Sequence, residues 1–166
     1  MVENKTRLSF GDSAKAPRHC EINSGHRILV VDDEDDIRRI NALILRDAGY
    51  KVDSVTDGAA AWDALQLNHY DLLLTDNNMP KMTGLELIEN LHAAHIRLPV
   101  IMVTGNLPSL TPDHTTLIEA VLLKPYSADE LLARVRNVLH ATEGGAKNTM
   151  PPPLPKAGNI RNGLRL

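Results

Sequence analysis

The sequence predicts an α/β fold in which helices flank a doubly wound, parallel sheet of five strands. The first reason is that short apolar segments alternate along the chain with segments whose apolar residues recur at helical spacing. The second is that several apolar runs stop abruptly at a polar residue, as buried strands do where they leave a sheet. Strands joined through helices run parallel. The expected strands are residues 26–31, 51–56, 70–76, 99–104 and 121–124.

Length and composition fit one globular domain with terminal extensions. The chain has 166 residues, of which 43% are hydrophobic, and a net charge of −3, which gives no basic footprint for nucleic acid. No apolar run is long enough to cross a bilayer or resembles a signal peptide. The single cysteine, Cys20, cannot form an internal disulfide. We therefore expect a cytoplasmic protein without membrane insertion or direct nucleic-acid contact.

The first expected strand stops at the acidic pair Asp32-Asp33. Two further acids follow, which suit the positive end of a helix dipole, and Gly49 supplies a stop. We expect a helix over about residues 34–48, with an apolar face formed by Ile37, Ile40, Ile44 and Ala48.

The second expected strand alternates like a half-buried strand and closes at Asp57-Gly58. An alanine-rich helix follows it. Trp62 lies on the same helical stripe as Leu65, which favours a packing role over a ligand platform.

The third expected strand is an apolar run that ends at one carboxylate, Asp76. A run this apolar indicates a strand buried on both faces, so its end delivers Asp76 to the edge of the sheet. Thr83 and Glu86 have the spacing of a capping box, which predicts a helix after a short loop. The loop begins with Asn77, Asn78, Met79 and Pro80, and Gly84 lets it turn tightly.

The last two expected strands end at Thr104 and Lys124. The connection between them contains prolines and threonines, so only a weak helix is expected, around residues 113–119. Ser127 and Glu130 can cap a final helix. The core face of that helix is Leu131, Val135, Val138 and Leu139.

The strand ends predict a site, because ligands of doubly wound sheets bind beyond the carboxyl ends of the strands. Carboxylates gathered there repel one another, so one would be driven toward protonation unless positive charge is supplied. Lys124 and a divalent cation supply it, and hard oxygen ligands favour Mg2+. The implied chemistry is phosphoryl transfer to Asp76, with Lys124 and Thr104 contacting the transferred group.

These residues resemble the receiver domains of two-component response regulators. The resemblance spans roughly residues 26–140 and rests on several motifs that match in order, which are Asp32-Asp33, Asp76-Asn77-Asn78-Met79-Pro80, Gly84, Thr104 and Lys124-Pro125. It implies a flavodoxin-like receiver fold, a five-stranded sheet with the order 2-1-3-4-5.

The resemblance also implies roles for the site residues. Asp76 would accept a phosphoryl group from a histidine kinase or a histidine phosphotransfer protein. Asp33, Asp76 and the backbone carbonyl of Asn78 would ligate Mg2+ directly, and Asp32 would act largely through water. Such a domain is a phosphoacceptor and not an enzyme with an external substrate, although it supports its own magnesium-dependent phosphorylation and dephosphorylation.

The sequence departs from the family pattern near the signalling surface. Val121 stands three positions before Lys124, where receivers usually carry an aromatic residue, and Gly105 replaces the more usual alanine. A short β-branched side chain cannot swing between buried and exposed positions. We therefore expect any switch to pass through the backbone of residues 106–119.

The two ends of the chain are expected to be extensions of the domain. Residues 1–25 have no period and are expected to be a flexible leader, and residues 141–166 are rich in proline and glycine and are expected to be a disordered tail without an output domain. The predicted function is a stand-alone response regulator. It would signal through phosphorylation-dependent contact with a downstream protein or through a phosphorelay.

Other functions remain open at this stage. A phosphate-independent adaptor with the same fold is suggested by Val121 and the weak fourth helix. A magnesium phosphohydrolase is disfavoured because such enzymes need a second acid two residues after the nucleophile, where this chain has Asn78. No glycine-rich phosphate loop follows the first strand, which argues against nucleotide binding.

The seven histidines lack metal-ligand spacing, and His114 and His140 are assigned no role.

Overall fold

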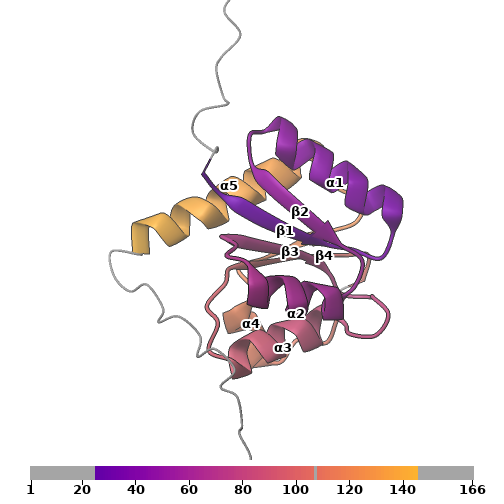
Figure 1. The fold of residues 1–166 in the computed structure, drawn as a ribbon, viewed down its shortest axis with the longest axis vertical. Helices are drawn as coiled ribbons and strands as arrows, with labels where there is room; N and C mark the ends of the chain where they lie inside the picture. The colour runs from indigo at the N-terminus through magenta and orange to yellow at the C-terminus, as the bar shows by residue number, and fades with distance from the viewer. Residues whose placement is uncertain (1–24, 107, 146–166) are drawn as a thin grey trace, which may run out of the picture.

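The computed structural model describes residues 25–106 and 108–145, which form ten alternating strands and helices (Figure 1). In chain order these are β1 (Arg27–Val31), α1 (Asp35–Asp47), β2 (Lys51–Val55), α2 (Gly58–Leu67), β3 (Leu72–Asp76), α3 (Gly84–Ala93), β4 (Val100–Thr104), α4 (Pro112–Leu117), β5 (Ala120–Leu123) and α5 (Ala128–Gly145).

The strands form one parallel sheet with the order β2-β1-β3-β4-β5, which confirms the predicted fold and strand order. The winding direction reverses between β1 and β3, where Val31 pairs with Thr75. Polar groups that follow these two strands therefore meet at the switch point of the sheet.

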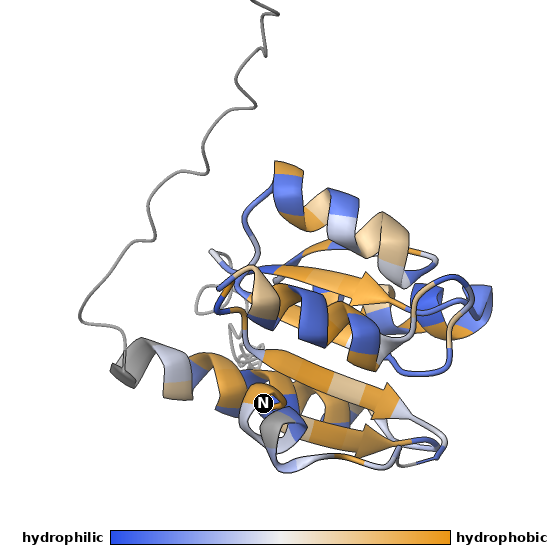
Figure 2. Ribbon diagram, turned by 90° about the horizontal axis from the view of Figure 1, so that it is seen from below, coloured by the Kyte–Doolittle hydropathy of each residue, from blue (hydrophilic) through white to orange (hydrophobic). Residues whose placement is uncertain are grey.

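The helices cover the sheet in two layers, and each layer has its own core (Figure 1). Successive strand side chains point to opposite faces, so Ile28 and Val30 pack with α1 and α5, while Leu29 and Val31 pack with α2 and α3. All residues of β3 and β4 are buried. Figure 2 shows these central strands chiefly as hydrophobic ribbon, as expected for strands covered on both faces.

Local capping explains where several helices begin. The predicted capping box is present at α3, where Thr83 Oγ1 accepts from the Glu86 N–H and the Glu86 carboxylate accepts from the Thr83 N–H at 2.7 Å. Ser127 and Glu130 make the same reciprocal contacts at α5. Asp57 caps α2 by accepting from the Ala60 N–H at 3.0 Å.

Helices α4 and α5 differ from their predicted bounds. Helix α4 begins at Pro112, one residue earlier than expected, because Thr111 caps it. It ends at Leu117, two residues earlier than expected, and the Glu119 N–H already donates to the Val100 carbonyl of β4 at 2.9 Å. Helix α5 continues to Gly145, past residue 140, where the sequence predicted the end of the domain. Glycine is a poor helix former, so the sequence predicts that Gly144-Gly145 belong to the tail, but helix α5 continues through both.

The expected leader and tail fall almost wholly on residues 1–24 and 146–166, which lie outside the described residues. Within residues 25–106 and 108–145, no helix is long and apolar enough to span a bilayer.

Candidate functional site

Three of the predicted site residues lie together at the carboxyl edge of the sheet. Asp32 follows β1, Asp76 ends β3 and Lys124 follows β5. Lys124 Nζ lies 3.1 Å from Asp32 Oδ2 and 3.2 Å from Asp76 Oδ1. The two carboxylate side chains are only 2% and 6% exposed, so the lysine joins two buried acids. The structure thus brings together residues that are up to 92 positions apart in the sequence.

Burial dominates the electrostatics of this cluster. Loss of water around Asp32 raises the pKa of its carboxyl, although the Glu34 N–H and Lys124 oppose that rise. The charge of Asp76 also raises the pKa of Asp32, but it is the smallest of the causes. Repulsion between the carboxylates is predicted to raise a pKa in this cluster, and the pKa of Asp32 is raised. The main cause of that rise, however, is desolvation and not repulsion. For Lys124, burial alone would lower the pKa, yet contact with Asp32 and Asp76 raises it.

The backbone around Asp76 is fixed by the start of α3. Asp76 Oδ2 accepts a hydrogen bond from the Asn78 N–H, while Gly84 N–H donates to the Asn77 carbonyl at 3.1 Å. A Cβ atom at Gly84 would overlap the Asp76 carbonyl oxygen, so only glycine permits this approach. The predicted tight turn at Gly84 is therefore present, and it holds the end of β3 against the first turn of the helix.

The other predicted site residues have different surroundings. Thr104 is fully buried, and its hydroxyl donates to the Asn106 carbonyl at 3.0 Å, within the loop after β4. Asp33 and the side chain of Asn78 are exposed beside the buried acids. The Thr104 hydroxyl is therefore already hydrogen-bonded within its own loop. A ligand at Asp76 would have to compete with the Asn106 carbonyl for this hydroxyl.

The structure adds residues that the sequence did not indicate. Glu34 Oε1 lies 3.2 Å from Lys124 Nζ, and its position next to Asp32-Asp33 is a signal that could have suggested it. Tyr126 Oη donates to Asn41 Oδ1 at 2.9 Å and joins the loop after β5 to α1. These two are 85 residues apart, so no local pattern could have predicted their contact.

The donor atoms of the cluster suit a hard cation. Within the described residues no three His, Cys, Asp or Glu side chains are arranged to hold a metal, so a cation would take fewer than three of these side chains as direct ligands, with main-chain oxygens and water beside them. Mg2+ is bound in this way, through one or two carboxylates with several waters retained. The residues present therefore fit Mg2+.

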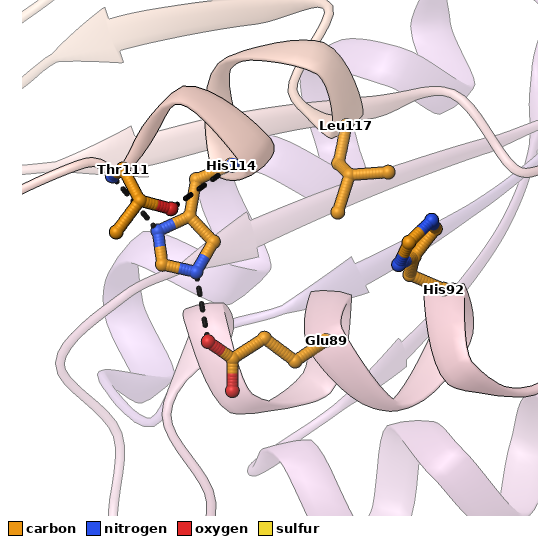
Figure 3. A pocket seen from close by; sticks show the side chains of 5 residues that line it. All are labelled: Glu89, His92, Thr111, His114 and Leu117. Atoms are coloured by element: carbon orange, nitrogen blue, oxygen red, sulfur yellow. Dashed lines mark hydrogen bonds and ion pairs between the residues drawn. The ribbon is translucent and has the colours of Figure 1, made fainter.

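A second surface feature lies between α3 and α4 (Figure 3). It is a hollow of about 340 Å³ lined by Glu89, His92, Thr111, His114 and Leu117. His114, which the sequence analysis left without a role, completes the cap of α4, because its Nδ1 accepts from the Thr111 N–H at 3.2 Å. The proton on Nε2 then faces Glu89 Oε1 at 2.8 Å. The spacing Thr-x-x-His was visible in the sequence, but histidine replaces the glutamate of the usual capping box.

Comparison with known proteins identifies the family. The family model of the response regulator receiver domain matches residues 28–136. The chain is 36% identical over 114 residues to the transcriptional regulatory protein DltR of Streptococcus agalactiae, covering 66% of this chain and 50% of DltR. It is 32% identical over 149 residues to TcrA of Mycobacterium tuberculosis, covering 87% of this chain and 56% of TcrA. The chain thus spans about half the length of these curated relatives.

Solved structures agree with this comparison. The response regulator TrrA of Thermotoga maritima, solved in complex with Mg2+ and BeF, matches with a TM-score of 0.63 and 28% identity over 68% of this chain and 98% of TrrA. The chemotaxis response regulator CheY4 of Vibrio cholerae matches with a TM-score of 0.62 and 29% identity over the same shares of the two chains. With the parallel sheet and the strand-end cluster, these matches show that the chain belongs to the response regulator receiver domain family, whose members are phosphoacceptor signalling domains.

Proposed function

We propose that Asp76 accepts a phosphoryl group from a histidine kinase or a histidine phosphotransfer protein. The observation that carries the proposal is the Asp76 carboxylate, buried at the end of β3 and 3.2 Å from Lys124 Nζ, with Asp32 on the other side of the ammonium group. A nucleophilic carboxylate needs nearby positive charge when a phosphate dianion approaches, and this lysine supplies it.

The proposed reaction uses the cluster as it lies in the structure. An Asp76 oxygen attacks phosphorus as the bond from phosphorus to the donor's histidine nitrogen breaks, and the product is an acyl phosphate on Asp76. Lys124 contacts the transferred group, which would relax its hold on Asp32. Mg2+, held by Asp33, Asp76 and the Asn78 carbonyl with Asp32 acting through water, would neutralise charge on the phosphoryl oxygens.

The signal would leave the site through Thr104. A phosphoryl oxygen is a stronger acceptor than the Asn106 carbonyl that now takes the Thr104 hydroxyl, so the hydroxyl turns toward Asp76 and the loop after β4 follows. We propose that a downstream protein in the cytoplasm reads this change by contact, or that the phosphoryl group passes onward in a relay.

Intact mass spectrometry with acetyl phosphate and Mg2+ tests the proposal. Wild-type protein should gain one phosphoryl group that hydroxylamine removes, and chelation of Mg2+ should prevent the gain. Asp76→Asn should gain none. Asp71→Asn is the matched control, because Asp71 is an exposed aspartate that precedes β3 and should not affect labelling. Labelling of Asp76→Asn, or labelling that ignores the chelator, would contradict the assignment.

The half-buried Val121 at the edge of the core under α4 favours one alternative, an adaptor that signals without phosphate. Capture of the downstream protein separates the two functions. An adaptor would bind its partner equally well as wild type and as Asp76→Asn, with or without acetyl phosphate.

A further inference from the structure

The loop between β3 and α3 has two anchored ends. At the first end the Asn78 N–H donates to Asp76 Oδ2. At the second end the Gly84 N–H donates to the Asn77 carbonyl at 3.1 Å, and the Leu85 N–H donates to Asn77 Oδ1 at 3.2 Å. These contacts tie the loop to β3 and α3. Within the tip of the loop, residues 79–82, Met79 is buried in the core and the Met82 N–H donates to the Pro80 carbonyl at 2.8 Å, while the exposed part around Lys81 has a further support.

Helix α2 supplies that support. Lys81 Nζ lies 2.7 Å from Asp57 Oδ2, across 24 positions of sequence. Next to this contact the backbone of Met82 crosses Gly58 so closely that a Cβ atom at Gly58 would lie 2.7 Å from the Met82 carbonyl oxygen. The loop tip is therefore seated on the first turn of α2 by one ion pair and one close backbone approach.

The conformation of Lys81 shows that its backbone alone does not favour this position. Its φ angle is 66°, in the left-handed region that non-glycine residues adopt at an energetic cost. Glycine would adopt this angle freely, yet the chain has a lysine whose side chain reaches Asp57. The contact of the ammonium group with Asp57 holds the side chain in one direction over this turn.

Asp57 is suited to hold a charged partner. Its side chain is 5% exposed, and its two oxygens have separate tasks, since Oδ1 accepts from the Ala60 N–H and Oδ2 faces Lys81. The hydrogen bond from Lys81, followed by that from Ala60, lowers the pKa of Asp57 to about 2. The carboxylate is therefore charged at neutral pH, and it is fixed by the helix that it caps.

We propose that the Lys81–Asp57 pair is a positioning clamp that sets the orientation of the Asn78 carbonyl for Mg2+. This inference rests on the proposed function, in which that carbonyl is a ligand. The peptide group of the Asn78 carbonyl is bounded on one side by the contact of Asn78 with Asp76. On the other side it is bounded by Met79, whose N–H donates to the Asn77 carbonyl at 3.2 Å, and then by the clamped residue Lys81. Lys81 and Asp57 touch neither the metal nor the phosphoryl group, and they act through the backbone.

Variants can separate the clamp from ordinary stabilisation. Lys81→Met keeps the apolar stem and removes the charge, whereas Lys81→Arg keeps the charge. Asp57→Asn retains an oxygen that can cap α2, because asparagine is as good a cap as aspartate, but it weakens the hold on Lys81. Lys51→Met is the matched control, since Lys51 is an exposed lysine at the start of β2.

NMR titration of the unphosphorylated protein with Mg2+, followed at the amides of Asn78 and Gly84, gives the dissociation constant. Lys81→Met and Asp57→Asn should each weaken Mg2+ binding about tenfold, the size typical of groups that orient a metal ligand. The double variant should bind no more weakly than either single variant, because the clamp is lost only once. Lys81→Arg should restore most of the affinity, and Lys51→Met should match wild type.

Two further measurements complete the test. Lys81→Met should raise the Mg2+ concentration for half-maximal phosphorylation by acetyl phosphate and leave the rate at saturating Mg2+ close to that of wild type. Its melting temperature without Mg2+ should stay within about 3 °C of wild type, because an ion pair with one exposed partner contributes little to stability.

The outcomes distinguish the clamp from the proposed function. Unchanged Mg2+ affinity in Lys81→Met, while wild-type Asp76 is still phosphorylated, would overturn the clamp alone. A large loss of magnesium-free stability in proportion to the loss of affinity would also overturn it, in favour of a purely structural pair. Failure of wild-type protein to bind Mg2+ or to be modified at Asp76 would overturn both proposals.

Discussion

Burial of Asp32 in the strand-end cluster carries an electrostatic cost. Its side chain is 2% exposed, and desolvation raises its pKa above the ordinary value of 3.8. A raised pKa in an acid means that folding disfavours its charged form, so the ionised carboxylate destabilises the native state above its native pKa. The cost shrinks as the pH falls through the native pKa, where the folded chain takes up the proton. Below 3.8 it is absent, because the folded and the unfolded chain both bind the proton.

The first consequence is that Asp32→Asn should stabilise the magnesium-free protein at neutral pH. Lys124 keeps Asp76 and Glu34 as partners, so no buried charge is left alone. The gain should appear as a melting temperature above that of wild type in chelator. Thermal melts in chelator, measured from neutral pH down to below 3.8, should show the gain shrinking with acidity.

Asp63→Asn is the control for that experiment, because Asp63 is an exposed aspartate on α2. A melting temperature of Asp32→Asn equal to or below that of wild type at neutral pH would show that contact with Lys124 outweighs desolvation.

At the scale of residues, strand ends were predictable and contacts between loops were not. Asp32, Asp76 and Lys124 each terminate an apolar run, and parallel strands bring such ends to one edge, so topology alone placed them together. The contacts Lys81–Asp57 and Tyr126–Asn41 join residues that no period relates. They depend on the path of each loop over its neighbouring helix, which only the assembled structure defines.

Helix α4 is the shortest helix among the described elements, with six residues, and it follows the loop that accepts the Thr104 hydroxyl. Its cap relies on the side chain of His114, and part of its surface borders the hollow in Figure 3. A helix this short has few hydrogen bonds to break, so local opening is easiest there.

We therefore predict that phosphorylation changes hydrogen exchange chiefly in residues 106–119. Thr104→Ala should remove this response while Asp76 remains modifiable, since the proposed switch passes through the hydroxyl that now donates to the Asn106 carbonyl in that loop. Exchange followed by mass spectrometry, with and without acetyl phosphate, measures the effect. Thr142→Ala on α5 is the matched control. Equal changes across α1 and α5, or none in 106–119, would exclude this route.

At the scale of elements, sequence patterns located the helices more reliably than their ends. The starts of α3 and α5 were predictable because serine or threonine with glutamate three residues later is a local signal. The end of α5 was not, because two glycines continue the helix where propensity predicts a stop. Val121 is half-buried and packs against the core on the side of the sheet that carries α2, α3 and α4, so its side chain has a packing role. The backbone therefore stays the predicted path of the switch.

For the whole molecule, Mg2+ should act as a stabilising ligand. A cation that binds the native cluster and not the unfolded chain raises the free energy of unfolding by mass action, by about 1.4 kcal/mol at ten times its dissociation constant. Melting temperature against Mg2+ concentration checks this, and Asp33→Ala should reduce the shift. Asp36→Ala on α1 serves as the matched control. An unchanged shift in Asp33→Ala would remove Asp33 from the proposed ligand set, and no shift of the wild-type protein at millimolar Mg2+ would contradict the set as a whole.

The overall architecture was predictable at two levels. Alternation of strands and helices established the parallel sheet, because helical crossovers leave no other common arrangement. Periodicity carries no information about which strands are neighbours, so the order 2-1-3-4-5 came from resemblance to receiver domains, and the pairing of β1 with both β2 and β3 confirms it.

The sheet also divides the interior into two compartments that can vary separately. Residues at alternate strand positions belong to different cores, so Ile28 and Val30 border one compartment, and Leu29 and Val31 border the other. A repacking substitution beneath α2 and α3 meets side chains of its own compartment and leaves those beneath α1 unchanged. The strand-end cluster of Asp32, Asp76 and Lys124 lies at the carboxyl edge of the sheet, between the two compartments. Receiver domains of this design can therefore diversify one flank for a new partner while the opposite flank, and the rim chemistry, stay the same.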